Sequence, residues 1–264
     1  MNTEELTRRT STARSSNRHR VSFIGAIRAE LLKLATVRAV LVTLLATVPL
    51  GVFFAFIGKG NLEAGSDLAA NAGSLAQIQG SFLLFASLIV SIASVLSIAS
   101  EHSTGQIGST LTILPRRGIV VAAKAIALGG VVWVLGFVTA MLSGLVLMGS
   151  AGPLPSNPFL LITASSIGAG FAWAAVAIIG LGIGGVLRSA AFGIASAFTL
   201  FFIAPLLLST MGLQAVLPYL PNVAGVDVIT SRMTDASLHG AAVLAVWVVV
   251  SLVGWGLLLR RRDV

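Results

Sequence analysis

The chain has 264 residues, of which 56% are hydrophobic and only 10% are charged, and its formal net charge is +8. Its mean hydropathy is +0.98, whereas soluble domains carry about 25% charged residues, so a soluble globular fold is excluded. The sequence has no cysteine, which excludes a disulfide framework, a thiolate nucleophile and a cysteine metal site. We expect an all-α, polytopic membrane protein.

The first 21 residues form a polar segment rich in arginine, serine and threonine. They show no apolar period, so we predict that residues 1–21 are a disordered cytoplasmic tail. A cleaved signal peptide is disfavoured because no long apolar run directly follows these arginines. The remainder, residues 22–264, is predicted to be a single transmembrane domain.

Residues 22–36 carry one helical stripe of apolar side chains, at Phe23, Ile27, Leu31 and Leu34. Charged residues such as Arg28 lie off this stripe. The pattern predicts an amphipathic helix in the cytoplasmic interface of a membrane, with its apolar side toward lipid. The alternative is a simple extension of the first membrane span, with no separate role.

Six apolar runs are long enough to cross a bilayer, which takes about 20 helical residues. They cover residues 37–57, 82–99, 125–148, 159–187, 190–209 and 241–259. Of the 17 lysines and arginines, all except Lys59 and Arg232 lie in segments that share one side. Segments rich in lysine and arginine stay in the cytoplasm, so both termini are predicted to be cytoplasmic. The protein itself is predicted to lie in the plasma membrane. These cations anchor helices and contact anionic lipid, and nucleic acid is not an expected partner.

The second span carries a stripe of serines at Ser87, Ser91 and Ser94. The stripe could line a wetted substrate path, or it could serve close helix packing, which is the favoured interpretation. No span has an ionisable residue near its middle, as ion-coupled carriers usually do. This absence favours a pathway driven from the cytoplasm and fits an amphiphilic or hydrophobic cargo.

The loop between the second and third spans contains a second amphipathic pattern, with Ile107, Leu111 and Leu114 at helical spacing. It predicts a short cytoplasmic helix that could lie on lipid or in a groove of a partner protein. Glu101 and Lys124 flank this loop. They could pair with each other or with a partner, although a plain interfacial carboxylate and a snorkelling lysine are the default interpretation.

The fifth span combines Phe198 and Phe202 with a proline and the pair Leu206–Leu207. Our hypothesis is a hydrophobic gate near the outer face; the simpler interpretation is lipid-facing aromatics and a tolerated kink. The following outer segment, residues 210–240, is too apolar for a freely solvated loop. We expect short helices there that dip back toward the bilayer.

Two segments resemble the permease subunits of ABC-2-type transporters, especially the actinobacterial ones with the architecture of ABCG-like (type V) exporters. The first is residues 30–38, and the second runs from Glu101 through Pro115-Arg116-Arg117-Gly118 to Lys124. The resemblance implies a six-helix half that dimerises with a second permease copy and is driven by a separate ABC ATPase subunit. It also implies that two inner elements receive the motion of the ATPase. Their residues would be Glu30, Lys33 and Arg38 in the first element, and Glu101, Thr104, Gly105, Pro115 and Arg116 in the second.

The sequence lacks a phosphate-binding Gly-x-x-x-x-Gly-Lys-Ser/Thr loop and a cytoplasmic segment long enough for a nucleotide-binding domain. ATP and Mg²⁺ are therefore expected on a partner subunit, with no cofactor on this chain. A Gly-x-Gly-x-x-Gly match at Gly180, Gly182 and Gly185 lies inside the fourth span, where helix packing is the better explanation. No catalytic or metal-binding residues are predicted.

We therefore predict the permease subunit of an ATP-driven exporter working by alternating access. The alternative from another class is a non-transporting membrane scaffold or sensor whose inner helices recruit a cytoplasmic partner. An intramembrane enzyme is disfavoured, because no span offers a paired nucleophile and base.

Overall fold

The computed structural model describes residues 22–58, 68–106, 108, 117–148, 158–230 and 234–261. These residues are almost entirely helical and include no strand. Six stretches are long and apolar enough to cross a membrane: Arg38–Gly58, Phe85–Ser103, Arg117–Met148, Phe159–Leu187, Ala190–Thr210 and Asp235–Leu259. The predicted all-α fold with six spans is thus confirmed. The predicted tail, residues 1–21, lies outside the described residues.

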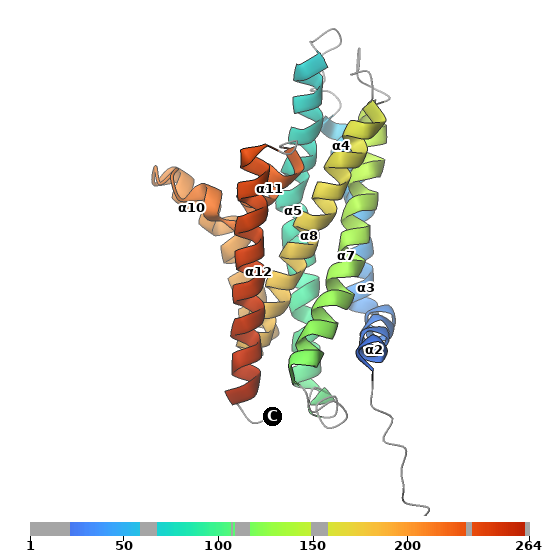
Figure 1. Ribbon diagram of the computed structural model, residues 1–264, viewed down its shortest axis with the longest axis vertical. Coiled ribbons are helices and arrows are strands. Elements are labelled where there is room, and N and C mark those ends of the chain that lie inside the picture. The colour runs from blue at the N-terminus through green and yellow to red at the C-terminus, as the bar shows by residue number, and fades with distance from the viewer. Residues whose placement is uncertain are drawn as a thin grey trace, which may run out of the picture.

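The N-terminal helix α2 (Phe23–Thr36) is a separate element and not an extension of the first span. Ser22 caps its first turn by accepting a hydrogen bond from the Gly25 amide. The helix ends at Val37, whose extended backbone (φ −80°, ψ 90°) breaks the path into α3 (Arg38–Leu45). Figure 1 shows α2 lying across one end of the bundle, whereas α3 follows the long axis.

The bundle is built around α8 (Pro158–Leu187), the most deeply buried of the spans. It packs against α5 (Leu68–Ser103) and α7 (Arg117–Met148), which also contact α4 (Thr47–Gly58). These helices run side by side along the long axis (Figure 1). The C-terminal end of α5 and the first turns of α7 lie at the end of the bundle next to α2.

Glycines on α8 permit this close packing. A Cβ on Gly180 would lie 3.1 Å from the Ser91 Cα of α5, and one on Gly182 would lie 2.6 Å from the Ser251 Cβ. The glycine pattern therefore marks helix contacts, as its place inside a span predicted.

The fifth span is divided into three parts: α9 (Ala190–Phe198), the π-helix η2 (Thr199–Ile203) and α10 (Ala204–Thr210). It follows α8 through a tight corner at Arg188, whose φ of 54° lies in the left-handed region. In Figure 1, α10 leaves the bundle at a marked angle to the other spans. The kink expected at Pro205 is therefore present.

The outer segment contains the short helices that its apolar character predicted. They are η3 (Leu217–Tyr219) and α11 (Pro221–Thr230), followed by α12 (Asp235–Arg261). Helix α11 packs against α5, α8 and α12, and a Cβ on Gly240 of α12 would lie 2.6 Å from the Ala224 carbonyl oxygen. The Trp247 indole donates to the Tyr219 carbonyl over 2.9 Å. Protein buries one side of α11, whereas residues 209–216 and Tyr219 are exposed in the single chain, so the burial that a bilayer requires holds for α11 but not for the backbone before it.

Candidate functional site

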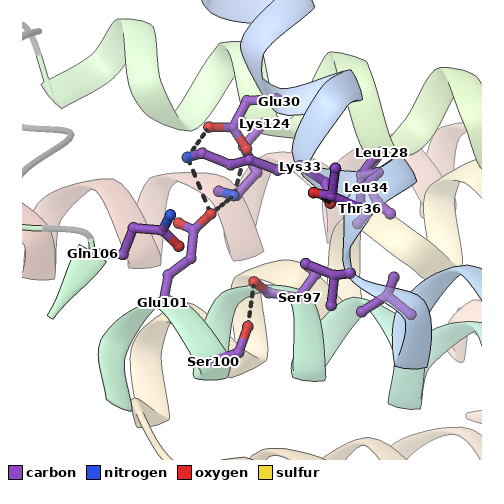
Figure 2. A pocket seen from close by; sticks show the side chains of 12 residues that line it. Glu30, Lys33, Leu34, Thr36, Ser97, Ser100, Glu101, Gln106, Lys124 and Leu128 are labelled. Atoms are coloured by element: carbon purple, nitrogen blue, oxygen red, sulfur yellow. Dashed lines mark hydrogen bonds and ion pairs between the residues drawn. The ribbon is translucent and has the colours of Figure 1, made fainter. Parts of the chain in front are cut away.

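Four charged side chains from three helices meet at the end of the bundle where α2 lies. Glu30 and Lys33 come from α2, Glu101 from the last turn of α5, and Lys124 from the second turn of α7. Figure 2 shows the four side chains pointing toward one another, with Gln106 beside them. We call these four residues the charge cluster.

Lys124 lies at the centre of the charge cluster. Its Nζ donates to the Glu30 Oε2 over 2.5 Å and to the Glu101 Oε1 over 2.7 Å. Lys33 makes the matching contacts, 2.7 Å to the Glu30 Oε1 and 3.2 Å to the Glu101 Oε1. Each carboxylate thus accepts from both lysines, and the two formal positive charges balance the two negative ones.

The helices place these side chains for identifiable reasons. Glu30 and Lys33 are three residues apart on α2, which puts them on neighbouring positions of one helical face. That face also buries Ala26, while Ile24 and Leu32 are among the most exposed residues of the helix. Burying a carboxylate while exposing leucine is unfavourable in water, but it suits a helix whose outer side touches lipid.

Burial gives the charge cluster its energetic weight. Glu30, Glu101 and Lys124 are each only 5% exposed, and the Lys33 side chain is 25% exposed. Buried ions lose much of their hydration, and hydrogen-bonded partners of opposite charge must compensate for that loss. Moving or removing any one of the four side chains would leave a buried charge without its partner, which is unfavourable. The ion pairs therefore hold α2, α5 and α7 in one relative position.

The two α2 members have shifted pKa values. Burial acts to raise the pKa of Glu30, but the charge and hydrogen bond of Lys124, together with those of Lys33, outweigh it and hold that pKa below its ordinary value. Burial acts to lower the pKa of Lys33, but the hydrogen bond that it donates to Glu30 and the charge of Glu101 outweigh burial and raise that pKa. Both groups are therefore held in their charged forms at neutral pH.

A pocket of about 80 Å³ adjoins the charge cluster. Besides the four charged residues it is lined by polar side chains of α5, Ser97 and Ser100, by Gln106, and by the junction between α2 and α3 at Thr36 and Val37. The space lies where three helices and one helix junction meet, so a small displacement of α2 would change its shape.

The structure brings together three of the predicted coupling residues, Glu30, Lys33 and Glu101. Arg38 lies at the start of α3, where it is exposed and forms no ion pair with the described residues. Thr104 is also exposed, and its hydroxyl donates to the Ser100 carbonyl over 2.8 Å. Gly105 follows with φ at 69°, a left-handed conformation that glycine adopts without strain and that ends the helix.

Part of the predicted second element cannot be placed. Pro115, Arg116 and residues 109–114 lie outside the described part of the chain, as does Ile107. The predicted coupling helix and its docking surface therefore stay predictions.

Lys124 is the member of the charge cluster that was left out of the predicted coupling residues. The default interpretation of Lys124 as a plain snorkelling lysine is wrong: of its two alternatives, a pair with Glu101 or with a partner, the 2.7 Å contact supports the pair with Glu101. The signal in the sequence was position: Val120, Lys124 and Leu128 are spaced by four residues and all three are buried on one face of α7. A lysine on a buried stripe needs an acidic partner.

The predicted path serines lie within the α5–α8 interface. Ser87, Ser91 and Ser94 are at most 1% exposed. The Ser91 hydroxyl donates to the Leu88 carbonyl over 2.9 Å, and the Ser94 hydroxyl donates to the Val90 carbonyl over 2.7 Å. Within one copy of the chain they pack against α8, and their part in a substrate path stays a prediction.

The predicted gate residues all lie on the fifth span: Phe198 ends α9, Phe202 lies in η2, and only Leu206 and Leu207 lie on α10, the part that leaves the bundle. Phe198 and Phe202 stack with ring centroids 5.4 Å apart. Leu206 and Leu207 are about half exposed on α10, at 55% and 52%. Their side chains are thus available to another molecule or to lipid, and a gate role stays a prediction.

The fold and the charge cluster define a multi-pass membrane protein whose helices are linked by ion pairs at one end. A family model described as "ABC-2 family transporter protein" matches residues 26–205, which is more than half of the chain and includes all four cluster residues. The chain belongs to this ABC-2 transporter family. No curated protein matches it.

Membership has direct consequences for the class of activity. The chain is a permease component of an ABC transporter, the transmembrane part and not the ATPase itself. The family also implies partnership with an ABC ATPase.

Proposed function

We propose that this chain is the transmembrane subunit of an ATP-driven exporter that moves an amphiphilic or hydrophobic substrate by alternating access. Two copies would form the pathway, and separate ATPase subunits would bind ATP and Mg²⁺. The observation that carries the proposal is the charge cluster, because it joins α2 to the inner ends of α5 and α7 through buried contacts. Force applied to α2 or to the end of α5 would then reach two spans together.

Charge placement supports a cytoplasmic position for this end. Among the described basic residues, Arg28 and Lys33 lie on α2, Arg38 begins α3, and Arg117 and Lys124 lie in the first two turns of α7, which α2 contacts. Segments rich in lysine and arginine remain in the cytoplasm. We therefore place both termini and the ATPase on that side of the plasma membrane, with the exposed apolar residues of α2 in contact with lipid.

The lack of a charged path supports an apolar cargo. The buried ionisable residues among those described gather at the inner end, and the middle of the bundle is lined by alanine, valine, leucine, serine and aromatic residues. Proton relays and ion-coupled carriers keep ionisable groups at mid-membrane depth. A hydrophobic or amphiphilic molecule fits such walls better than an ion.

The proposal is tested by co-purifying the chain with candidate ABC ATPase subunits, reconstituting the complex in lipid vesicles, and measuring ATP hydrolysis with and without amphiphilic cargoes. We expect cargo to stimulate hydrolysis. The double variant Glu30→Gln with Lys124→Met, which keeps the buried charges balanced but removes the ion pair between α2 and α7, should abolish the stimulation while bound ATPase still hydrolyses ATP. Phe192→Leu, at a site on α9 that is 70% exposed, is the matched control and should leave stimulation unchanged. A chain that binds a cytoplasmic protein but never an ATPase would instead support the scaffold alternative.

A further inference from the structure

The second feature that joins distant parts of the chain is a hydrogen bond at the kink of the fifth span. In an α-helix the carbonyl of residue 201 accepts from the amide of residue 205. Residue 205 is proline, which has no N–H. In an α-helical register the Phe201 carbonyl would therefore have no backbone donor, deep in a membrane protein where an unpaired carbonyl is costly.

Asn222 supplies the missing donor. Its side-chain Nδ2 donates to the Phe201 carbonyl oxygen over 2.7 Å, and both residues are fully buried, with 0% exposure. Asn222 is the second residue of α11, in the outer segment between the fifth and sixth spans. The bond thus ties α11 to the span at the point where its backbone changes direction.

The local helix geometry shows the same adjustment. Residues 199–203 form a π-helix, and the Ala204 amide bonds to the Thr199 carbonyl, five residues back. Such π-bulges and prolines are the usual causes of sharp helix kinks. Beyond this point α10 leaves the bundle (Figure 1), so the kink sets the direction of α10.

Only the nitrogen of the Asn222 side-chain amide forms a hydrogen bond with the described residues. Its Oδ1 is buried and has no hydrogen-bond partner among the described residues. A half-satisfied amide is unfavourable in a core, so its presence needs an explanation. The only orientation that avoids placing two oxygens together directs the nitrogen at the carbonyl, which is the orientation found.

We propose that Asn222 is a positioning residue that compensates for Pro205, so that α10 and α11 keep a fixed relative position and move as one unit. The inference concerns how the outer half is held and does not rest on transport. It makes a specific demand: Asn222 should matter only while residue 205 is proline. An alanine at 205 would restore the amide that bonds to the Phe201 carbonyl once the helix takes the α register.

The test measures the distance between spin labels on Met211, at the end of α10, and Leu238, on α12 beside α11. Both side chains are more than 60% exposed, and the chain has no native cysteine, so two introduced cysteines are the only labelling sites. The full chain is reconstituted in lipid, with labelled molecules diluted by unlabelled ones. We expect one narrow distance distribution for the parent protein.

Asn222→Leu should broaden that distribution several-fold in the Pro205 background and leave it nearly unchanged in a Pro205→Ala background. Thr230→Val is the control, because it removes a hydroxyl from the same helix whose bond, to the Val226 carbonyl, is local. If Asn222→Leu folds only when alanine occupies position 205, the proposal is supported. Equal broadening in both backgrounds, no broadening in either, or failure to fold in both would overturn it.

Discussion

The Lys124 Nζ lies 2.5 Å from the Glu30 Oε2, although 94 residues separate the two in the sequence. This contact attaches the N-terminal helix α2 to the third span, and the 2.7 Å contact from Lys124 to Glu101 attaches the second span to the same point. One ammonium group on α7 thus links α2 and α5 to the third span.

Replacing Lys124 with methionine should strongly destabilise the protein. The substitution leaves two buried carboxylates with Lys33 as the remaining lysine of the charge cluster, and breaking a buried ion pair costs about 3–5 kcal/mol. Lys33→Met should cost less, because its side chain is 25% exposed and water can reach the carboxylates. Thermal unfolding of the purified chain in lipid nanodiscs measures both. Equal losses for the two variants would show that burial does not set the strength of the charge cluster.

The double variant Glu30→Gln with Lys124→Met should recover part of the lost stability. It removes one charge of each sign and leaves Lys33 paired with Glu101, so no net charge remains buried. Neighbouring groups in one network show interaction energies of about 0.5–3 kcal/mol in a double-mutant cycle. The same unfolding measurement gives the cycle. Strictly additive losses would contradict direct coupling between the two residues.

The stability of the folded protein should fall at both acid and alkaline pH. The pKa of Glu30 is held below its ordinary 4.5, so its contribution is complete above about pH 4.5 and is lost as the pH falls through the lowered value. The pKa of Lys33 is raised above its ordinary 10.5, so its contribution is complete below about pH 10.5 and is lost as the pH rises through the raised value. Unfolding temperatures measured from acid to alkaline pH should therefore show a plateau between these limits.

Glu30→Gln is the control for the acid limb of that profile. The variant has no carboxylate at this position to protonate, so its stability should fall less steeply below pH 4.5 than that of the parent protein. Identical acid limbs would mean that other carboxylates cause the loss.

A methyl group on Gly182 should disturb the contact between the fourth and sixth spans. The new Cβ would lie 2.8 Å from the Ser251 carbonyl oxygen and 2.9 Å from its carbon, and backbone cannot move aside easily. Overpacking of this kind costs about 1–3 kcal/mol. Gly256→Ala on α12 is the control, since nothing lies within 4 Å of its Cβ position. Unfolding in nanodiscs should separate the two, and a neutral Gly182→Ala would refute tight packing there.

Shortening Leu206 and Leu207 to alanine should change export or basal ATP hydrolysis if α10 carries the outer gate. The two side chains are about half exposed, so their loss should lower stability little, and the effect should appear in function. Transport in vesicles containing the chain and its ATPase is the measurement. Leu238→Ala, at an exposed site on α12, is the control. Unchanged transport in the double alanine variant would remove the gate hypothesis.

Much of the fold could be predicted from the sequence because a bilayer allows few solutions. A segment that crosses hydrocarbon must satisfy its own backbone hydrogen bonds, so length and apolarity nearly suffice to identify a spanning helix. The six predicted runs all fall on spans of the structure. The ends were less well placed: α7 begins at Arg117 and α12 at Asp235, several residues before the predicted runs, because polar helical turns continue past the apolar core.

The candidate site was only partly predictable. The resemblance to ABC-2 permeases indicated Glu30, Lys33 and Glu101. For Lys124 the default interpretation was a snorkelling lysine, and a pair with Glu101 was an alternative. A helical period shows which residues share a face of one helix, but it says nothing about which face of another helix lies opposite. The same limit applied to Asn222, whose bond to Phe201 depends on α11 folding back against the fifth span.

By itself the sequence determined the solvent, the number of spans and the distribution of positive charge, because these follow from local composition and from the thickness of a membrane. Only the tertiary structure decided that Glu30, Lys33, Glu101 and Lys124 compensate one another and that an asparagine completes the backbone at a proline kink. Those pairings join residues from different helices, and the free energy that selects them comes from burying polar groups together, which happens only when the helices pack.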